Sequence, residues 1–163
     1  MTEVICAPGK WARNGKTVLF LAGSIDMGSA TDWQANVIDS LQELPLLILN
    51  PRRDDWDSSW KQGLYAEPFR AQVLWELEGL ERSDLILMYF AEGSKSPITL
   101  LELGLCAAQW PDKLIVCSSP GFWRKGNIDI VTQRYGVTVY DSLEAAIIKI
   151  KSLVTLATPS LGQ

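Results

Sequence analysis

Residues Ser94–Ala108, with the sequence SKSPITLLELGLCAA, predict the start of a helix directly after a buried strand. The apolar run Leu85–Phe90 before them is typical of such a strand. Ser96 is suited to the N-cap of the helix and Pro97 to its first position. An apolar stripe at helical spacing is predicted to be its buried face, and it consists of Ile98, Leu101, Leu105 and Ala108.

Two glutamates are predicted to border the buried faces of helices on either side of this strand. Glu102 lies beside the stripe just described. Glu76 lies beside a similar stripe in a helix expected over residues 68–82, and that stripe consists of Phe69, Val73, Leu77 and Leu80. Burying a carboxylate costs free energy, so each position requires an explanation. A pair of carboxylates can cleave a glycosidic bond, one as nucleophile and the other managing the proton of the leaving group. The alternative is that both side chains bend outward into solvent.

The composition and net charge exclude several classes of binding partner. The chain has 163 residues, a net charge of −4 and no apolar run long enough for a membrane span, so we expect one domain that binds neither a nucleic acid polymer nor a membrane. Residues 1–11 have no apolar signal segment, and the three cysteines form no pairing or metal-binding pattern. These features favour a reduced, cytoplasmic protein.

The sequence contains no histidine. This excludes a nucleophile activated by histidine and any metal site that needs a histidine ligand. Acid–base chemistry must therefore use carboxylates, lysine, tyrosine or cysteine. We expect no metal and no organic cofactor.

Alternating strand and helix patterns predict an α/β fold, a flavodoxin-like doubly wound sheet of five parallel strands in the order 2-1-3-4-5 with helices on both faces. The expected strands are 18–22, 46–50, 85–90, 114–118 and 137–140. Residues 1–17 are expected to form an irregular arm, residues 18–156 a single domain, and residues 157–163 a frayed tail. Ligands of such sheets bind beyond the carboxyl ends of the strands, where this chain has polar and glycine-containing loops.

The segment LELG at residues 101–104, which follows a serine-containing loop, resembles the nucleoside 2-deoxyribosyltransferase family and its nucleoside 5′-monophosphate N-glycosidase relatives. The resemblance covers roughly residues 18–140. It implies that Glu102 is the nucleophile that attacks C1′ of the sugar. It also implies that Glu76, eight residues before Asp84, contacts or protonates the departing base.

The same resemblance implies several substrate-binding residues. Ser96, six residues before Glu102, matches a serine that helps to hold the 5′-phosphate in the glycosidases, where the deoxyribosyltransferases have an aspartate. Gly23, Ser24 and Ile25 resemble the first loop of the glycosidases, although Asp26 stands where those enzymes have an arginine. Asp55 and Trp56 are candidates for the base pocket; a turn role for Asp55 and a packing role for Trp56 explain them equally simply.

Relatives in this family complete each active site with a residue from a neighbouring subunit. Asn127 is the candidate for that residue here, which implies a homo-oligomer, a dimer or larger, with shared active sites. The alternative is that Asn127 is an N-cap before a helix starting at Ile128.

The sequence therefore predicts an enzyme that cleaves or transfers the N-glycosidic bond of a (deoxy)nucleoside or its 5′-monophosphate through a covalent glycosyl-glutamate intermediate. The substrate would be a small nucleoside or nucleotide. The first alternative is a non-catalytic nucleotide-binding or sensing module on the same fold, since a fold does not determine a function. A flavodoxin-like FMN-binding protein is a weaker alternative, because the loops lack a clear phosphate cradle.

Overall fold

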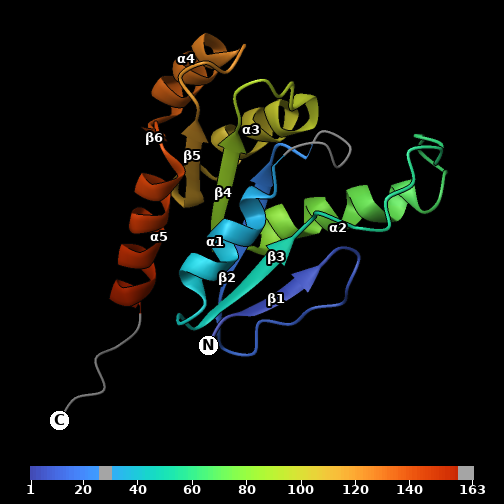
Figure 1. Cartoon of the computed structure of the whole chain (residues 1–163), viewed down its shortest axis with the longest axis horizontal. Helices are drawn as coiled ribbons and strands as arrows, with labels where there is room; N and C mark the ends of the chain where they lie inside the picture. The colour runs from blue at the N-terminus through green and yellow to red at the C-terminus, as the bar shows by residue number, and fades with distance from the viewer. Residues whose placement is uncertain (26–30, 158–163) are drawn as a thin grey trace.

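The computed structural model of the chain contains one parallel sheet of six strands, in the order β1-β3-β2-β4-β5-β6 (Figure 1). It describes residues 1–25 and 31–157. The strands are β1 Glu3–Cys6, β2 Thr17–Gly23, β3 Leu46–Asn50, β4 Leu85–Phe90, β5 Leu114–Ser118 and β6 Val139–Tyr140. The expected parallel α/β fold is confirmed, but the prediction of five strands was wrong and the strand order differs from the predicted one.

The additional strand is β1, which comes from the segment that was expected to be an irregular arm. It pairs in parallel with β3, with Glu3 opposite Leu47 and Cys6 opposite Asn50. β1 has only four residues and alternates between half-buried and exposed positions. Such a short edge strand lacks the long apolar run that identified the inner strands, which explains why the sequence pattern did not reveal it.

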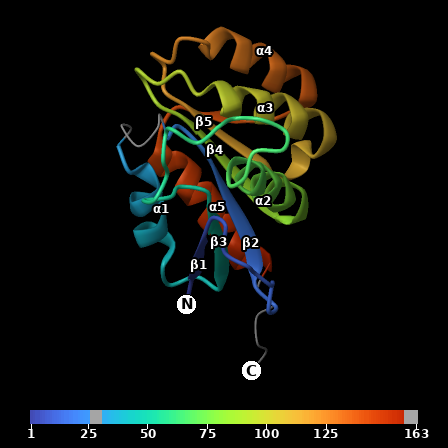
Figure 2. The same cartoon turned by 90° about the vertical axis from the view of Figure 1, so that its right-hand side faces the viewer.

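In the described part of the chain, five α-helices cover the two faces of the sheet, which gives a three-layer α/β/α arrangement. They are α1 Trp33–Leu41, α2 Phe69–Arg82, α3 Pro97–Gln109, α4 Lys125–Tyr135 and α5 Leu143–Ala157, and a short 3₁₀ helix spans Pro111–Lys113. Figure 2 shows α1 and α5 on one side of the sheet and α2, α3 and α4 on the other. Ala157 ends α5, and the remaining residues of the expected frayed tail, 158–163, lie outside the described residues.

Alternate residues of each inner strand enter two separate cores. In β2, Phe20 packs into the core under α2, α3 and α4, whereas Leu19 and Leu21 pack into the core under α1 and α5. The inner strands are buried on both faces, which is why they read as continuous apolar runs in the sequence. This arrangement fixes the carboxyl ends of β2, β3, β4 and β5 at one edge, where the expected ligand-binding loops begin.

The buried faces of α2 and α3 differ from the predicted stripes. In α3 the buried residues are Thr99, Leu103, Cys106 and Ala107, while Ile98 and Leu101 are 58% and 71% exposed. Apolar residues occupy nearly every position of this helix, so the periodicity could not identify the face toward the sheet.

In α2 the buried residues are Gln72, Trp75, Gly79 and Leu80, so of the predicted stripe of Phe69, Val73, Leu77 and Leu80 only Leu80 is fully buried. The reason is a close approach at Gly79. A Cβ atom at this position would lie 2.5 Å from the Phe20 ring, so the helix contacts β2 through its glycine.

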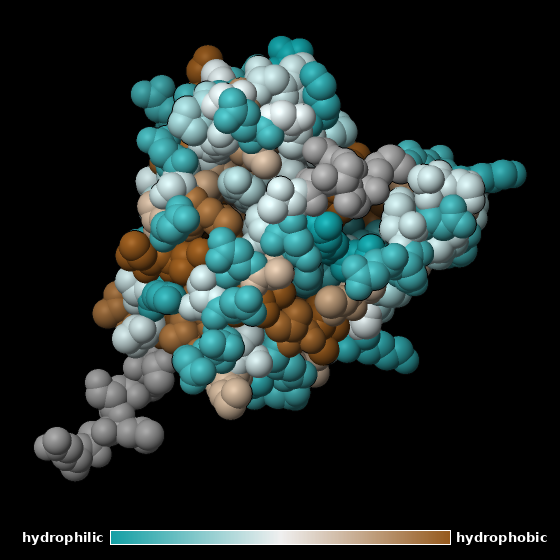
Figure 3. Space-filling model, in the orientation of Figure 1, coloured by the Kyte–Doolittle hydropathy of each residue, from teal (hydrophilic) through white to brown (hydrophobic). Residues whose placement is uncertain are grey.

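Apolar side chains are also exposed on the surface away from the carboxyl edge of the sheet. Figure 3 shows a group of them over α5, where Ile148 is 68% exposed. Across residues 1–25 and 31–157, no helix combines the length and the apolar character that crossing a bilayer requires.

Candidate active site

The first loop at the carboxyl edge leaves β2 through Gly23, which has a φ of 156°. A Cβ atom at Gly23 would lie 2.5 Å from the Tyr89 carbonyl oxygen and 2.7 Å from the Trp33 ring. Glycine is therefore required for β2 and β4 to approach each other at the switch point of the sheet. Ile25 is half-buried beyond this point, and Asp26 lies outside the described residues.

Three serine hydroxyls join this loop to the start of α3. Ser24 Oγ lies 2.7 Å from Ser96 Oγ, which lies 2.6 Å from Ser94 Oγ, and all three side chains are buried. The Ala91 amide donates to Ser24 Oγ at 3.1 Å. The structure thus brings together Ser24 and Ser96, two of the predicted substrate-binding residues.

Ser96 occupies the N-cap position of α3, as predicted, but it does not cap the helix with its side chain. Its backbone is left-handed, with φ 46° and ψ 50°, and its hydroxyl makes no cap hydrogen bond. Pro97 takes the first helical turn, as expected. The unusual backbone conformation turns the Ser96 hydroxyl toward Ser24 and Ser94, away from the first amides of the helix.

Glu102 lies on α3, one and a half turns from these serines, and is half-buried. Among the described residues, its carboxylate has no hydrogen-bond or ion-pair partner. Burial raises the pKa of Glu102 from 4.5 to about 8, and the negative charge of Glu76 adds to this effect. The two predicted glutamates are therefore close enough to interact electrically.

Glu76 projects from α2 and is also half-buried. Its Oε1 accepts a hydrogen bond of 2.8 Å from Nε2 of Gln72, one turn earlier on the same helix. Burial raises the pKa of Glu76, and this hydrogen bond partly offsets the rise because it favours the charged form. The alternative that both glutamates are freely solvated does not hold.

The loop after β3 carries the predicted residues Asp55 and Trp56. Asp55 is exposed and receives two hydrogen bonds of 2.8 Å from Arg53, which hold the pKa of its carboxyl below its usual value. The ring centroids of Trp56 and Trp60 are 5.0 Å apart in an edge-to-face contact. Both predicted residues thus have structural contacts within their own loop.

Asn127 is the third residue of α4 and is exposed. The alternative that it caps a helix starting at Ile128 was wrong, since α4 begins at Lys125 with Arg124 in the cap position. Asn127 lines a groove of about 300 Å³ between α3 and α4. Trp123, also in this groove, donates from Nε1 to the Lys95 carbonyl at 3.0 Å and so ties the loop after β5 to the loop after β4.

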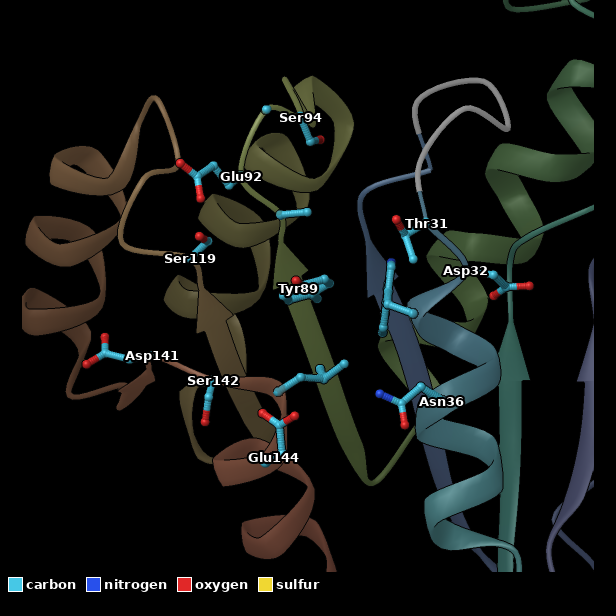
Figure 4. Close-up of a pocket in the computed structure, with 14 residues that line it drawn as sticks. Thr31, Asp32, Asn36, Tyr89, Glu92, Ser94, Ser119, Asp141, Ser142 and Glu144 are labelled. Carbon is cyan, nitrogen blue, oxygen red and sulfur yellow. The ribbon is translucent and has the colours of Figure 1, made fainter.

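A larger cavity of about 790 Å³ lies on the other face of the sheet, between the first turns of α1 and α5 (Figure 4). Neither Glu76 nor Glu102 lines it. Its carboxylates are all exposed, and they come from the N-cap of α1, the loop after β4 and the region where α5 starts. They are Asp32, Glu92, Asp141 and Glu144.

Neither the hydrogen bond from Gln72 to Glu76 nor the contact of Arg53 with Gln72 was predicted from the sequence. Gln72 is 5% exposed, and the Arg53 side chain is 8% exposed. The spacing of Gln72 and Glu76 at i and i+4 was a usable signal, because side chains at this spacing meet on a helix. Within the parts of the chain that the structure describes, no group of three or more histidine, cysteine, aspartate or glutamate side chains is placed to hold a metal ion.

Comparison with protein families confirms the resemblance seen in the sequence. Residues 16–122, which include both glutamates, match the family described as nucleoside 2-deoxyribosyltransferase like. The chain belongs to the nucleoside 2-deoxyribosyltransferase-like family. Membership of this family supports an enzyme of the glycosyl-transfer type.

A solved structure supports the fold of this nucleoside 2-deoxyribosyltransferase-like protein independently. The crystal structure of a conserved protein from Enterococcus faecalis V583 superimposes with a TM-score of 0.62 at 13% sequence identity, over 85% of this chain and 99% of that chain. At this identity the similarity concerns the fold alone. No curated protein matches the sequence.

Proposed function

We propose that this protein cleaves or transfers the N-glycosidic bond of a nucleoside or nucleoside 5′-monophosphate, with Glu102 as the nucleophile and Glu76 as the group that assists departure of the base. The observation that carries the proposal is the half-buried Glu102 carboxylate beside Glu76, without a hydrogen-bond or ion-pair partner among the described residues. Glu102 also lies in the LELG segment, within the part of the chain that matches the family.

The proposed reaction has two steps. A Glu102 carboxylate oxygen forms a bond to C1′ while the C1′–N bond breaks, and the base nitrogen takes the bonding electrons together with a proton from Glu76. Water or a second base then attacks C1′ and releases Glu102, and Glu76 takes up the proton of the attacking group. Hydrolysis and transfer differ only in which nucleophile arrives in the second step.

A partly desolvated carboxylate without a partner suits this chemistry. The transition state of glycosidic cleavage carries positive charge on the sugar ring. This charge stabilises the ionised Glu102 more than a neutral ground-state sugar does, so the interaction favours the transition state over the bound substrate. A permanent cation beside Glu102 would remove this advantage.

The serine cluster is the proposed site for the 5′ end of the sugar. Ser24, Ser94 and Ser96 place three hydroxyls beside the first turn of α3. Hydroxyls near a helix N-terminus suit either a 5′-hydroxyl or a 5′-phosphate, because the first amides of the helix favour negative charge. Gly23 and Ile25 would contact the same end of the substrate.

We also propose that the active protein is a homo-oligomer in which Asn127 reaches the site of a neighbouring subunit. Two observations support this proposal. Asn127 is exposed beside the groove between α3 and α4, and Ile98 and Leu101 expose apolar surface on the same side of the sheet. The molar mass in solution, measured by light scattering after size exclusion, tests it; a purely monomeric protein would contradict it.

The test of the reaction is a chromatographic assay for free base. Purified protein is incubated with a panel of nucleosides and 5′-monophosphates, with and without an acceptor base, in parallel with Glu102→Gln. We expect the wild type to release base from at least one substrate and Glu102→Gln to release none above background. Release that requires an acceptor base would identify a transferase, and release without one a hydrolase.

The same assay can contradict the proposal. If the wild type binds nucleotides without releasing base from any member of the panel, the protein is a binding or sensing module on this fold. Equal base release by the wild type and by Glu102→Gln would show that another residue is the nucleophile.

A further inference from the structure

Among the described residues, Gln72 is the one side chain that forms a hydrogen bond with the Glu76 carboxylate. It lies on α2, one turn before Glu76, and is 5% exposed. Its Nε2 donates to Glu76 Oε1 at 2.8 Å and to the Pro51 carbonyl at 3.1 Å. Both hydrogens of the amide are therefore engaged, one with the catalytic candidate and the other with the chain just after β3.

Arg53 holds the opposite end of the same amide. Its Nη1 donates to Gln72 Oε1 at 3.4 Å, while Nε and Nη2 bind the Asp55 carboxylate at 2.8 Å each. The Arg53 guanidinium also lies 5.1 Å from the ring centroid of Trp60. Acceptor and donors of the Gln72 amide are thus all occupied, which leaves the side chain a single orientation.

We propose that Gln72 is a positioning residue for Glu76, and that Arg53 holds Gln72 in place from the loop after β3. The inference rests on the function proposed above, in which Glu76 assists departure of the base. One oxygen of Glu76 is occupied by Gln72, so the other oxygen is the one that remains for the base. Gln72 thereby determines which oxygen faces the substrate and in which direction.

The groups that affect Glu76 directly or through Gln72 come from α3, from the loop after β3 and from α2 itself. Glu102 faces it from α3, and Arg53 approaches Gln72 from the loop after β3. On α2 itself, the Gln72 hydrogen bond lowers the pKa of Glu76 against the larger upward effect of burial. Removing the Gln72 amide should consequently raise the pKa of Glu76 further, because the charged form loses a donor.

The chain offers a matched control in Gln34. This glutamine lies on α1 and is fully buried, and its Oε1 accepts from Nη1 of Arg52 at 3.5 Å. Two buried glutamines are therefore each contacted by one of two consecutive arginines. Only Gln72 donates a hydrogen bond to a glutamate.

The experiment compares Gln72→Met with Gln34→Met. The titration of the Glu76 carboxyl is followed by carbon-13 NMR, with Glu76→Gln used to assign its signal, so this measurement needs no turnover. We expect the titration midpoint of Glu76 to rise in Gln72→Met and to stay at the wild-type value in Gln34→Met. In the base-release assay, kcat/KM of Gln72→Met should fall about tenfold, because a hydrogen bond to a charged group is lost, and its pH profile should shift in the same direction as the titration.

Several outcomes would overturn the inference. A folded Gln72→Met with the wild-type Glu76 titration would do so, and so would equal shifts in both methionine variants, since these would indicate a general packing effect. If Gln72→Met does not fold, Arg53→Met decides the matter: we expect a smaller upward shift of Glu76, and no shift would overturn the proposal. A wild type without base release would count against the proposed reaction, while the NMR titration would still test the link between Gln72 and Glu76.

Discussion

Two groups of carboxylates lie at the carboxyl edge of the same sheet, on opposite faces, and they differ in their access to water. Glu76 and Glu102 are half-buried under α2 and α3, and burial raises the pKa of both. The four carboxylates around the 790 Å³ cavity near α1 and α5 are exposed. Carboxylates in water are well solvated in their charged form, whereas partly desolvated ones gain from any positive charge that develops beside them.

In the proposed function the reacting carboxylates lie outside the larger cavity, although Ser94 of the serine cluster lines it. Cavity size alone would favour the face with α1 and α5 as the active site. The desolvation of Glu102 and the match with the family favour the face with α2 and α3. Strongly shifted pKa values mark functional sites more directly than volume does when a reaction needs a poised acid or nucleophile. Each of the following predictions tests this distinction.

The largest expected effect is the difference in base release between variants of the half-buried glutamates and of the exposed carboxylates. Glu102→Gln should lower base release by about 10³-fold or more, because a carboxamide cannot replace the nucleophile. Glu144→Gln in the open cavity should change it by less than about twofold, since an exposed surface charge has little effect on a distant reaction. Similar losses in the two variants, measured by initial rates of base release, would abolish the distinction.

The pH dependence of the wild type should follow the coupled pair of glutamates. The proposed first step needs Glu102 ionised and a proton on Glu76, so the reactive form is the pair that carries one proton. The raised pKa of Glu102, about 8, marks the pH at which the pair loses this proton, so kcat/KM should fall about tenfold per pH unit above pH 8. Initial rates at low substrate concentration on either side of pH 8 would measure this limb. A profile that stays flat through and above pH 8 would contradict a shared proton with a raised pKa.

The free energy of unfolding should depend on pH through Glu102. The folded protein retains a proton on Glu102 between pH 4.5 and about 8 that the unfolded chain has released, so the free energy of unfolding falls as the pH rises through this window. Glu102→Gln removes this dependence and should raise the free energy of unfolding at pH 8.5 by about 1–4 kcal/mol, by the conversion of a pKa shift into free energy. Denaturant unfolding at pH 5 and pH 8.5 would measure it, with Glu144→Gln as the control that should stay near the wild type.

A pair of glycines compares the packing of the two faces and should give the smallest effects. Gly79→Ala places a methyl group against the buried Phe20 ring and should destabilise the protein by about 1–3 kcal/mol through overpacking. Gly121→Ala meets only the exposed, flexible Glu92 side chain beside the open cavity, and its effect should stay within about 0.5 kcal/mol. Thermal unfolding of both variants measures the difference, and a larger loss at Gly121 would mean that the cavity side is tightly packed.

Much of the architecture could be predicted from the sequence, because the inner strands are buried on both faces. The apolar runs at 46–50, 85–90 and 114–118 coincide with β3, β4 and β5. The edge strand β1 was not predictable in the same way, since half of its residues face solvent. The buried face of α3 was not predictable either. The helix is apolar at nearly every position, so its sequence does not indicate which side packs against the sheet.

The candidate site was predictable where it depends on position along the chain, and not where it depends on side chains meeting across elements. Glu102 and Glu76 were predicted from their place beside the apolar stripes of two helices and from the family resemblance, and the structure brings their charges within interaction range. The contact of Arg53 with Gln72 joins two residues that are 19 positions apart, through a loop that no periodic pattern describes. The Ser24–Ser96 contact, over 72 positions, arises only from the parallel pairing of β2 and β4.

The two consecutive arginines after β3 contact both helical layers. Arg52 contacts a glutamine on α1, and Arg53 contacts a glutamine on α2, so two adjacent residues contact helices on opposite faces of the sheet. The sheet separates these layers, but the loop after β3 contacts both of them. The two contacts therefore join α1 to the helix that carries Glu76 through a single peptide unit.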